Sequence, residues 1–237
     1  MIFFKKKQTV LLTGAAKGIG WATAQKLAAA GFDLILLDKN KGPWQKQANK
    51  LAQEHKIQVQ TFVLDITQAS SVKRLVARLS GQKIHILINN AGVITPNNFL
   101  DKQSDKEVRL MLDVNLWGMI LVTKYFLMHL KASNGLIVNI ASGAGIKASA
   151  KFAAYCASKF GVVGFSQAMA KELTKLVKVL IITPGATNTS LFKKGFGQKR
   201  KALYQPEDIA DIIVSSIKDQ KKYSTGAIID KCRHLEP

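Results

Sequence analysis

Short apolar runs alternate along the chain with longer segments of helical pattern. The first run, residues 9–12, leads into a glycine-rich stretch and then into the alanine-rich segment 21–30, whose apolar side carries Leu27. Similar apolar runs occupy residues 34–37 and 136–140. Such runs predict buried strands, and their alternation with helices predicts βαβ units around a parallel sheet. We therefore predict an α/β fold with one Rossmann-type, doubly wound domain: a seven-stranded parallel sheet with helices on both faces.

The length and the absence of a linker predict a single domain. The 237 residues suffice for one large core, and neither an internal repeat nor a low-complexity stretch divides them,. We therefore assign residues 1–237 to one domain. Residues 1–4 are apolar but too few for the core of a signal peptide, and no apolar stretch approaches the ~18 residues of a membrane span,. We expect no integral membrane association.

A glycine-rich turn, Thr-Gly-Ala-Ala-Lys-Gly-Ile-Gly, follows the first predicted strand. Gly14 permits a tight turn, and Gly18 and Gly20 allow the backbone to approach a pyrophosphate closely. The helix that follows offers free N–H groups and the positive end of its dipole. The strand–turn–helix context therefore predicts a dinucleotide site, and Lys17 and Ile19 lie within its turn.

An acidic residue, Asp38, closes the second predicted strand about 20 positions after the glycines, as a dinucleotide site requires,. Its carboxylate can accept hydrogen bonds from both ribose hydroxyls of an adenosine and would repel a 2′-phosphate, so it favours NAD over NADP. Lys17 and Lys39 could instead attract that phosphate. We expect NAD as the cofactor and keep NADP open.

The strongest chemical pattern is Tyr155 with Lys159, preceded by Ser142. Four residues apart on a helix, the phenol and the ammonium lie on one face about one turn apart. An ordinary tyrosine has a pKa near ~10 and is a poor acid or base at neutral pH, whereas a neighbouring positive charge lowers that pKa. The spacing therefore predicts a tyrosine prepared for proton transfer. The alternative is an amphipathic helix that merely contains both residues.

With these motifs in order, the chain resembles the short-chain dehydrogenase/reductase family over nearly its whole length. Further family motifs are matched by residues 65–66 after the third strand, by Asn-Asn-Ala-Gly at 89–92 after the fourth, and by residues 184–189 after the sixth. By this resemblance the catalytic residues are Asn115, Ser142, Tyr155 and Lys159. The residues implied in cofactor binding are Gly14, Lys17, Gly18, Ile19, Gly20, Asp38, Asp65, Ile66, Asn89, Ala91, Gly92, Tyr155, Lys159, Pro184, Gly185, Thr187 and Thr189.

The resemblance implies an NAD(P)-dependent oxidoreductase that transfers a hydride between the nicotinamide and a small-molecule carbonyl compound or secondary alcohol. Tyr155 would be the general acid and base, Lys159 would also bond the nicotinamide ribose, and Ser142 would hold the substrate oxygen. Asn115 would hold a water of a proton relay. Two alternatives stay open: a catalytically silent cofactor-binding sensor, and a ketoacyl-(carrier protein) reductase-like enzyme that uses NADPH and docks an acidic partner on Lys171.

Two departures from the family pattern concern assembly. The stretch 172–184 lacks the glycine that the family usually carries before its sixth strand. Residues 230–232 read Asp-Lys-Cys, without the Gly-Gly tail that many members use at a subunit interface. We expect a homodimer or homotetramer and leave the arrangement open.

A formal net charge of +20 is unusual for such a fold, and lysine supplies most of it. A solvated lysine-rich surface would explain the charge without a function. The functional alternatives are an acidic substrate or carrier protein, an anionic membrane surface, or nucleic acid. We expect no nucleic-acid partner, because the sequence shows neither a basic groove interleaved with aromatic residues nor a recognised module.

One local cluster of cations lies within segment 187–205, where the family carries a mobile loop over the substrate. Its like charges repel one another, and an anionic ligand would relieve that repulsion. We hypothesise that the cluster, with hinge glycines beside it, orders over a negatively charged substrate or carrier group; its members are Lys193, Lys194, Lys199, Arg200 and Lys201. The substrate pocket is expected to be fairly apolar and lined by Ile94, Phe152 and residues 143–147 and 190–204.

The remaining candidate ligands point to ordinary intracellular chemistry. Cys156 and Cys232 do not make a disulfide framework,. The four histidines, which show no metal-ligand spacing, are His55, His85, His129 and His234. We expect a cytoplasmic location and no catalytic metal.

Overall fold

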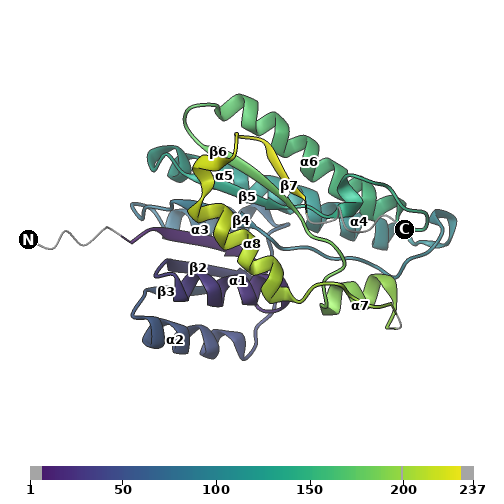
Figure 1. Ribbon diagram of the computed structural model, residues 1–237, viewed down its shortest axis with the longest axis horizontal. Helices are drawn as coiled ribbons and strands as arrows, with labels where there is room; N and C mark the ends of the chain where they lie inside the picture. Colours follow the sequence, from purple (N-terminus) through teal and green to yellow (C-terminus); the bar gives the residue numbers. More distant parts are fainter. Residues whose placement is uncertain (1–6, 199, 231–237) are drawn as a thin grey trace, which may run out of the picture.

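The computed structural model describes residues 7–198 and 200–230 of the chain (Figure 1). Its centre is a seven-stranded sheet in the order β3-β2-β1-β4-β5-β6-β7, in which all neighbouring strands are parallel. This arrangement confirms the predicted doubly wound sheet. The strands are β1 (Thr9–Thr13), β2 (Asp33–Asp38), β3 (Val59–Val63), β4 (Ile86–Asn89), β5 (Leu136–Ile140), β6 (Lys178–Thr183) and β7 (Ala227–Asp230).

Helices cover both faces of the sheet. On one face lie α1 (Gly18–Ala29), α2 (Trp44–His55) and α8 (Pro206–Lys218), and α8 crosses in front of the strands in Figure 1. The other face is covered by α3 (Ala69–Arg78), α5 (Met119–Ala132) and α6 (Ala153–Leu173), with α4 (Asp105–Leu112) packed against α6. A short helix, α7 (Ser190–Phe196), lies beyond the strand ends.

The pattern of the central strands explains why two helical layers form. Every residue of β1 is buried, and successive side chains point to opposite faces,. Val10 and Leu12 therefore pack with α1 and α8, whereas Leu11 packs with α3 and α5. Because both faces of a parallel sheet are covered, its strands are apolar without interruption rather than alternating.

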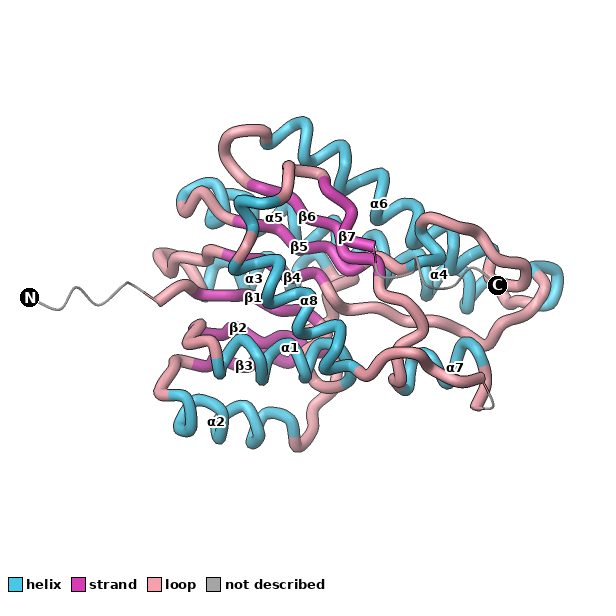
Figure 2. The backbone as a smooth tube through the Cα atoms, in the orientation of Figure 1, coloured by secondary structure: helices cyan, strands magenta, loops and turns pink. Residues whose placement is uncertain are grey.

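The carboxyl ends of all strands meet at one end of the molecule, where the longest loops also gather (Figure 2). The chain order reverses between β1 and β4, which are neighbours in the sheet. In open α/β sheets a ligand binds in the crevice outside the strand ends at such a switch point. The fold therefore places the candidate site between β1 and β4.

A long apolar helix corrects one expectation. Asp105–Ala132 runs without interruption through α4, a π-helical segment and α5, and by length and composition alone it could cross a membrane. In the structure Val122, Phe126 and Leu130 of α5 are fully buried against the sheet. The stretch is therefore long enough for a span, contrary to the sequence prediction, but its packing is that of a core helix.

Candidate active site

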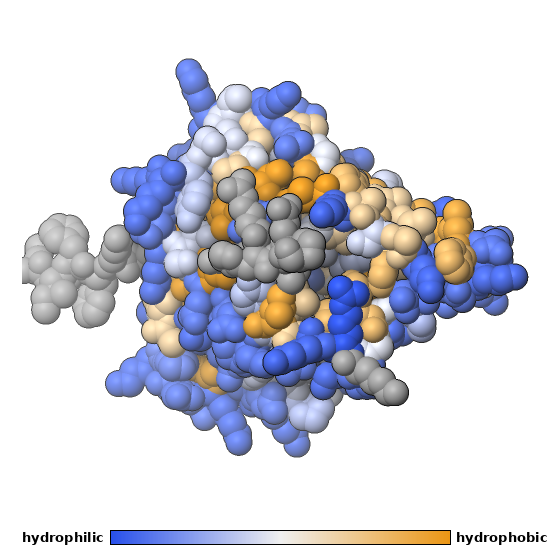
Figure 3. All heavy atoms as spheres, turned by 45° about the vertical axis from the view of Figure 1, so that its right-hand side comes forward, coloured by the Kyte–Doolittle hydropathy of each residue, from blue (hydrophilic) through white to orange (hydrophobic). Residues whose placement is uncertain are grey.

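A cavity of about 1000 Å³ opens at the carboxyl ends of the strands. Figure 3, which brings this end of the molecule forward, shows hydrophobic residues in the middle of the face and hydrophilic residues along its margins. Every residue predicted to bind a cofactor lines the cavity except Asn89, and every predicted catalytic residue lines it except Asn115. The sequence motifs, far apart along the chain, therefore meet in one hollow.

The glycine turn forms one wall, and its shape requires glycine. Gly14 and Gly18 have φ angles of +67° and +56°. A Cβ atom at Gly14 would lie 2.8 Å from Ala91 Cα, and one at Gly20 would lie 2.0 Å from the Gly14 carbonyl oxygen. The first helix begins at Gly18, earlier than predicted, because the third glycine of the turn already belongs to its first turn.

The amino end of α1 fits the pyrophosphate of a dinucleotide. Its N-cap residue, Lys17, adopts an extended conformation and makes no side-chain capping bond, and the first turn contains no acidic residue. The first N–H groups of the helix thus lack a side-chain acceptor and face the cavity with the positive end of the helix dipole. A bound pyrophosphate would satisfy them, so the residues present fit a nicotinamide dinucleotide.

Asp38 is held rigidly at the end of β2. Its Oδ2 accepts a hydrogen bond from the Ala16 N–H at 3.1 Å, and its Oδ1 accepts one from the Asn40 N–H at 3.0 Å. The carboxylate therefore braces the glycine turn while it lines the cavity. Each carboxylate oxygen has further lone pairs, so Asp38 can still accept hydrogen bonds from ribose hydroxyls.

Asp65 and Lys39 face each other across the ends of β3 and β2. Lys39 Nζ lies 2.8 Å from Asp65 Oδ2, and Thr67 donates from both its N–H and its hydroxyl to Asp65 Oδ1. Burial raises the pKa of Asp65, but the bonds from Lys39 and Thr67 outweigh burial and hold that pKa below its ordinary value. Lys39, a candidate phosphate ligand in the sequence, is therefore already paired with a carboxylate.

The two asparagines at the end of β4 place their side chains differently. The Asn89 amide is buried in the sheet, where its Nδ2 donates to Asn139 Oδ1 at 2.8 Å and to Thr123 Oγ1 at 3.0 Å. The prediction that Asn89 contacts the cofactor is therefore wrong for its side chain. Asn90 lines the cavity instead, and its Nδ2 donates to the carbonyls of Thr13 and Gly14. Asn90 belongs to the same Asn-Asn-Ala-Gly motif. The alternation of side chains along a strand did not by itself say which of the two asparagines points toward the cavity.

Tyr155 and Lys159 lie on the first turns of α6, and both are almost fully buried at the cavity wall. Lys159 Nζ donates to the Ile140 carbonyl at 3.0 Å, which ties α6 to the end of β5. Ser142 follows β5 directly, and its hydroxyl accepts the Ala144 N–H at 3.2 Å. The strand end and the helix start therefore place a hydroxyl, a phenol and an amine together.

Burial dominates the acid–base properties of this group. It raises the pKa of Tyr155 to about 12, against the opposing effect of the hydrogen bond with Ser142. It also lowers the pKa of Lys159 to about 8. The expected lowering of the tyrosine pKa by Lys159 is therefore wrong, because both groups have lost their solvation,.

Asn115 lies in the π-helical segment Asp113–Gly118 between α4 and α5. Its Oδ1 accepts the Val93 N–H at 2.7 Å, and its Nδ2 donates to the Val93 carbonyl at 2.9 Å and to Ser158 Oγ at 3.0 Å. Single π-turns inside α-helices are frequent at functional sites. Here the side chain does not line the cavity but fixes the loop after β4 against α6.

The substrate side of the cavity is closed by segment 187–205, whose ends are tied together. Thr187 pairs with Tyr204 in a parallel bridge, and the Leu203 N–H donates to the Ala186 carbonyl at 2.8 Å. Gly195 is buried in α7, where a Cβ atom would lie 2.5 Å from Ile94 Cδ1. The expectation of a hinge at this glycine is wrong, because Gly195 permits close packing of α7.

A stack of aromatic rings fixes α7 further. The Phe196 ring lies 4.6 Å from that of Phe152 and 4.9 Å from that of Phe192. Ile94 and Phe152, both predicted to line the substrate pocket, are instead buried behind it. Of the predicted basic cluster, Arg200 lines the cavity, Lys193, Lys194 and Lys201 do not, and Lys199 lies outside the described residues.

Three comparisons identify the relatives of this chain. The family profile described as short chain dehydrogenase matches residues 8–200. The chain belongs to the short-chain dehydrogenase/reductase family. An NADPH-dependent pterin aldehyde reductase of Arabidopsis thaliana is 34% identical over 206 residues, which cover 85% of this chain and 83% of that protein. A 3-oxoacyl-(acyl-carrier-protein) reductase of Thermotoga maritima is 32% identical over 235 residues, which cover 92% and 94%.

A solved structure agrees with this assignment. The 3-ketoacyl-(acyl-carrier-protein) reductase from Brucella melitensis, complexed with NADH, matches with a TM-score of 0.83 at 26% identity, over 94% of this chain and 96% of that chain. As a short-chain dehydrogenase/reductase, the protein is an NAD(P)-dependent oxidoreductase that acts on carbonyl or CH–OH groups. The cavity brings together the glycine turn, Ser142, Tyr155 and Lys159, and Asn115 lies behind it, bonded to Ser158.

Proposed function

We propose that the protein catalyses reversible hydride transfer between a nicotinamide cofactor and a carbonyl compound or secondary alcohol, with Tyr155 as the general acid and base. One observation carries the proposal: the Tyr155 phenol lies in the cavity wall, hydrogen-bonded to Ser142 and one helical turn from Lys159. When bound, the nicotinamide would supply or accept the hydride. The chain itself supplies the proton and the polar groups around the substrate oxygen.

In reduction, Tyr155 donates its proton to the oxygen of the nascent alkoxide, and Ser142 donates a hydrogen bond that stabilises the charge developing there. The raised pKa of Tyr155 keeps the phenol protonated at neutral pH. Lys159 is one turn away and can restore the proton, because its lowered pKa lets the amine exchange protons near pH 8. In oxidation the same groups act in reverse.

A substrate screen with Tyr155→Phe tests the proposal. Loss of a general acid costs about 10²–10⁴-fold in turnover, so Tyr155→Phe should lower kcat at least about 10²-fold and leave the affinity for NAD(H) nearly unchanged. Lys159→Ala should harm both turnover and cofactor affinity. Tyr125→Phe is a matched control, because Tyr125 lies on α5 and not in the cavity. Near-normal turnover by Tyr155→Phe would overturn the assignment.

We propose NAD as the preferred cofactor. The support is Asp38, which is fixed at the end of β2 with its carboxylate in the cavity, together with the pairing of Lys39 with Asp65. None of the ion pairs of residues 7–198 and 200–230 includes Lys17, which keeps NADP possible. The ratio of kcat/KM for NADH and NADPH tests the preference, and a ratio of one or below would contradict it.

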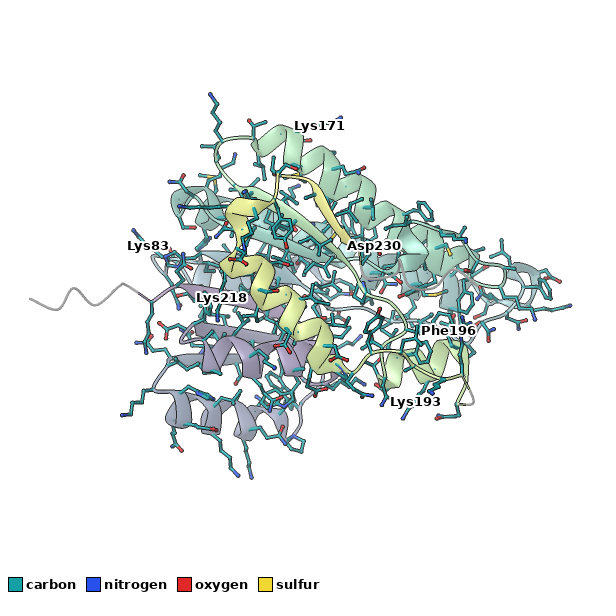
Figure 4. The ribbon with its side chains drawn as sticks, viewed as in Figure 1. Lys83, Lys171, Lys193, Phe196, Lys218 and Asp230 are labelled. Carbon is teal, nitrogen blue, oxygen red and sulfur yellow. The ribbon has the colours of Figure 1, made fainter. Side chains whose placement is uncertain are left out.

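The carrier-dependent and silent alternatives remain testable in the same screen. Lys171 is exposed on the last turn of α6 (Figure 4). At a rise of 1.5 Å per residue, it lies about 24 Å along the helix from Tyr155,. The carrier-dependent enzyme would reduce a carrier-bound ketoacyl substrate far faster than the free thioester. In that enzyme, Lys171→Glu should abolish the difference between the two rates. Cofactor binding without turnover of any carbonyl compound or alcohol would favour the sensor.

We further propose a homo-oligomer that forms through the exposed side chains beside the crossing of α6 and the π-helical segment. A Cβ atom at Gly161 would touch Leu116, so the two elements cross closely there. Trp117 and Phe160, the sequence neighbours of these two residues, are 50% and 42% exposed. Exposed apolar side chains that lie together can mark a protein–protein interface. Light scattering of the wild type and of Trp117→Lys tests this. A monomeric wild type would refute it.

We also propose a cytoplasmic location, supported by the free thiol of buried Cys156,. Cell fractionation with detection of the native protein would test it. Recovery in a secreted or membrane fraction would contradict it.

A further inference from the structure

The substrate half of the cavity is an apolar chamber with a polar floor. Tyr155 and Ser142 form the floor, close to the end of β5. The walls come from the loop after β4, from α4, from the turn after Ser142 and from α7. The wall residues are Val93, Leu110, Ile146, Leu191, Phe192 and Phe196. A ligand that places its carbonyl at Tyr155 would therefore surround its carbon skeleton with aliphatic and aromatic groups.

Two cations interrupt this apolar lining. Lys147 follows the turn after Ser142, and its backbone N–H donates to the Gly143 carbonyl at 2.9 Å, which fixes the start of its side chain relative to the floor. Arg200 follows α7, and its guanidinium carbon lies 4.9 Å from the centre of the Phe196 ring. Both side chains are exposed to solvent on one side and face the cavity on the other. An apolar chamber with cations at its margin is suited to an amphipathic molecule with an anionic end.

The carboxylates of the cavity do not neutralise these two cations. Asp65 is paired with Lys39 at the adenosine end. Asp38 accepts backbone hydrogen bonds at the same end. Asp230, at the end of β7, accepts a hydrogen bond from Thr183 Oγ1 at 2.8 Å. Among the ion pairs of residues 7–198 and 200–230, none includes Lys147 or Arg200.

Two other cations of segment 187–205, Lys193 and Lys194, do not line the cavity. Figure 4 shows Lys193 and Phe196 on different sides of α7, with Lys193 pointing away from the body of the molecule. The charge of Lys194 acts on Glu107 of α4, whose pKa is lowered chiefly by hydrogen bonds with Ser104 and further by Lys194. Lys193 and Lys194 therefore serve as internal controls: they carry two positive charges on the nearby helix α7 without lining the cavity.

We propose that Lys147 and Arg200 bind the carboxylate of an amphipathic substrate whose carbonyl or hydroxyl group lies at Tyr155. This proposal rests on the proposed function and names its substrate class: keto acids or hydroxy acids with an apolar skeleton between the two polar ends. The planar guanidinium of Arg200 can grip a carboxylate with two parallel hydrogen bonds, and Lys147 adds a point charge. The chamber between the cations and the floor would exclude water from the skeleton and strengthen both interactions.

Matched pairs of ketones test the proposal, each pair consisting of a keto acid and its methyl ester, for example 4-acetylbenzoate and methyl 4-acetylbenzoate. A charge-assisted hydrogen bond is worth about tenfold or more in affinity, so the wild-type enzyme should show kcat/KM at least about tenfold higher for the acid. The double variant Lys147→Gln/Arg200→Gln should raise KM for the acid about tenfold or more and leave KM for the ester unchanged. Lys193→Gln/Lys194→Gln should preserve the preference.

A binding measurement separates this inference from the proposed chemistry. The dissociation constant of the keto acid, measured by calorimetry on Tyr155→Phe with NADH present, should rise at least about tenfold when Lys147 and Arg200 are also replaced by Gln. It should also rise with ionic strength while both cations are present. If neither acids nor esters are reduced although the acid binds in this way, the proposed function fails and the anion site stands.

Three results would overturn the proposal. One is equal use or equal binding of acids and esters by the wild-type cavity. Another is a loss of acid preference in the Lys193→Gln/Lys194→Gln control as large as that in Lys147→Gln/Arg200→Gln. The preference would then depend on the general surface charge rather than on Lys147 and Arg200. A preference for neutral ketones would also exclude this substrate class.

Discussion

The buried amine of Lys159 should make the stability of the protein rise with pH above neutrality. Lys159 is 5% exposed, and burial lowers its pKa from 10.5 to about 8. That difference corresponds to about 3 kcal/mol between the charged and neutral forms, at about 1.4 kcal/mol per pH unit. Removing the charge with a side chain of similar length, Lys159→Met, should abolish this pH dependence.

The sign follows from where the proton is bound. Below about pH 8 both the folded and unfolded chains carry the charge, so the folded protein bears the full cost of burying it. Between about pH 8 and 10.5 the folded chain has lost the proton and the unfolded chain keeps it, so stability rises with pH,. Tyr155 acts in the opposite direction only above pH 10, since its pKa rises from 10.0 to about 12.

Urea unfolding of the nucleotide-free protein at pH 7, 8, 9 and 10 measures the effect. Relative to Lys159→Met, the wild type should gain about 2–3 kcal/mol in free energy of unfolding between pH 8 and 10. The comparison with the variant cancels the titration of the many surface lysines. A constant difference between the two proteins from pH 7 to pH 10 would refute the argument that desolvation controls this amine.

Three further substitutions test other parts of the site. Asp38→Ser should raise KM for NADH and lower KM for NADPH in steady-state assays, since a ribose acceptor and a repulsive charge are both lost; unchanged values would contradict the role of Asp38. Asn115→Ala should lower the free energy of unfolding by about 2–4 kcal/mol, because the Val93 N–H and the Ser158 hydroxyl lose a buried partner,. Denaturant titration measures this change, and a loss below about 1 kcal/mol would contradict the structural role of Asn115. Gly195→Ala should cost about 1–3 kcal/mol in free energy of unfolding and raise substrate KM, because the new Cβ atom would meet three side-chain carbons of Ile94,. Ile94→Ala removes all three carbons and should restore substrate KM in the double variant; no rescue would point to another cause.

The sheet and the catalytic group could be predicted because local patterns specify them. Uninterrupted apolar runs between amphipathic segments are typical of parallel strands with two covered faces, and β1 and β2 have that pattern,. Tyr155 and Lys159 share one helix, so their spacing alone fixes their relation. These predictions depended on neighbours in the sequence. The structure confirmed the sheet and places Tyr155 and Lys159 together at the cavity wall.

Other properties depended on which way side chains point in the assembled molecule. Asn89 and Asn90 are adjacent, and only the register of β4 against β5 turns the first into the core and the second toward the cavity. The pKa of Tyr155 depended on desolvation by elements that no local spacing reveals. Lys193 and Arg200 looked equivalent in the sequence, but one faces solvent and the other the cavity.

The neighbouring positions of β1 and β4 also affect how the chain is made. Val10 pairs with Ile86, and the intervening residues form β2, β3 and three helices. At a synthesis rate of ~5–20 residues per second, β1 waits about 4–15 s on the ribosome before its second partner emerges. During that time its open edge is a template for wrong pairing with other nascent chains. Expression at reduced temperature or with a holdase chaperone should therefore raise the yield of native protein more than any surface substitution.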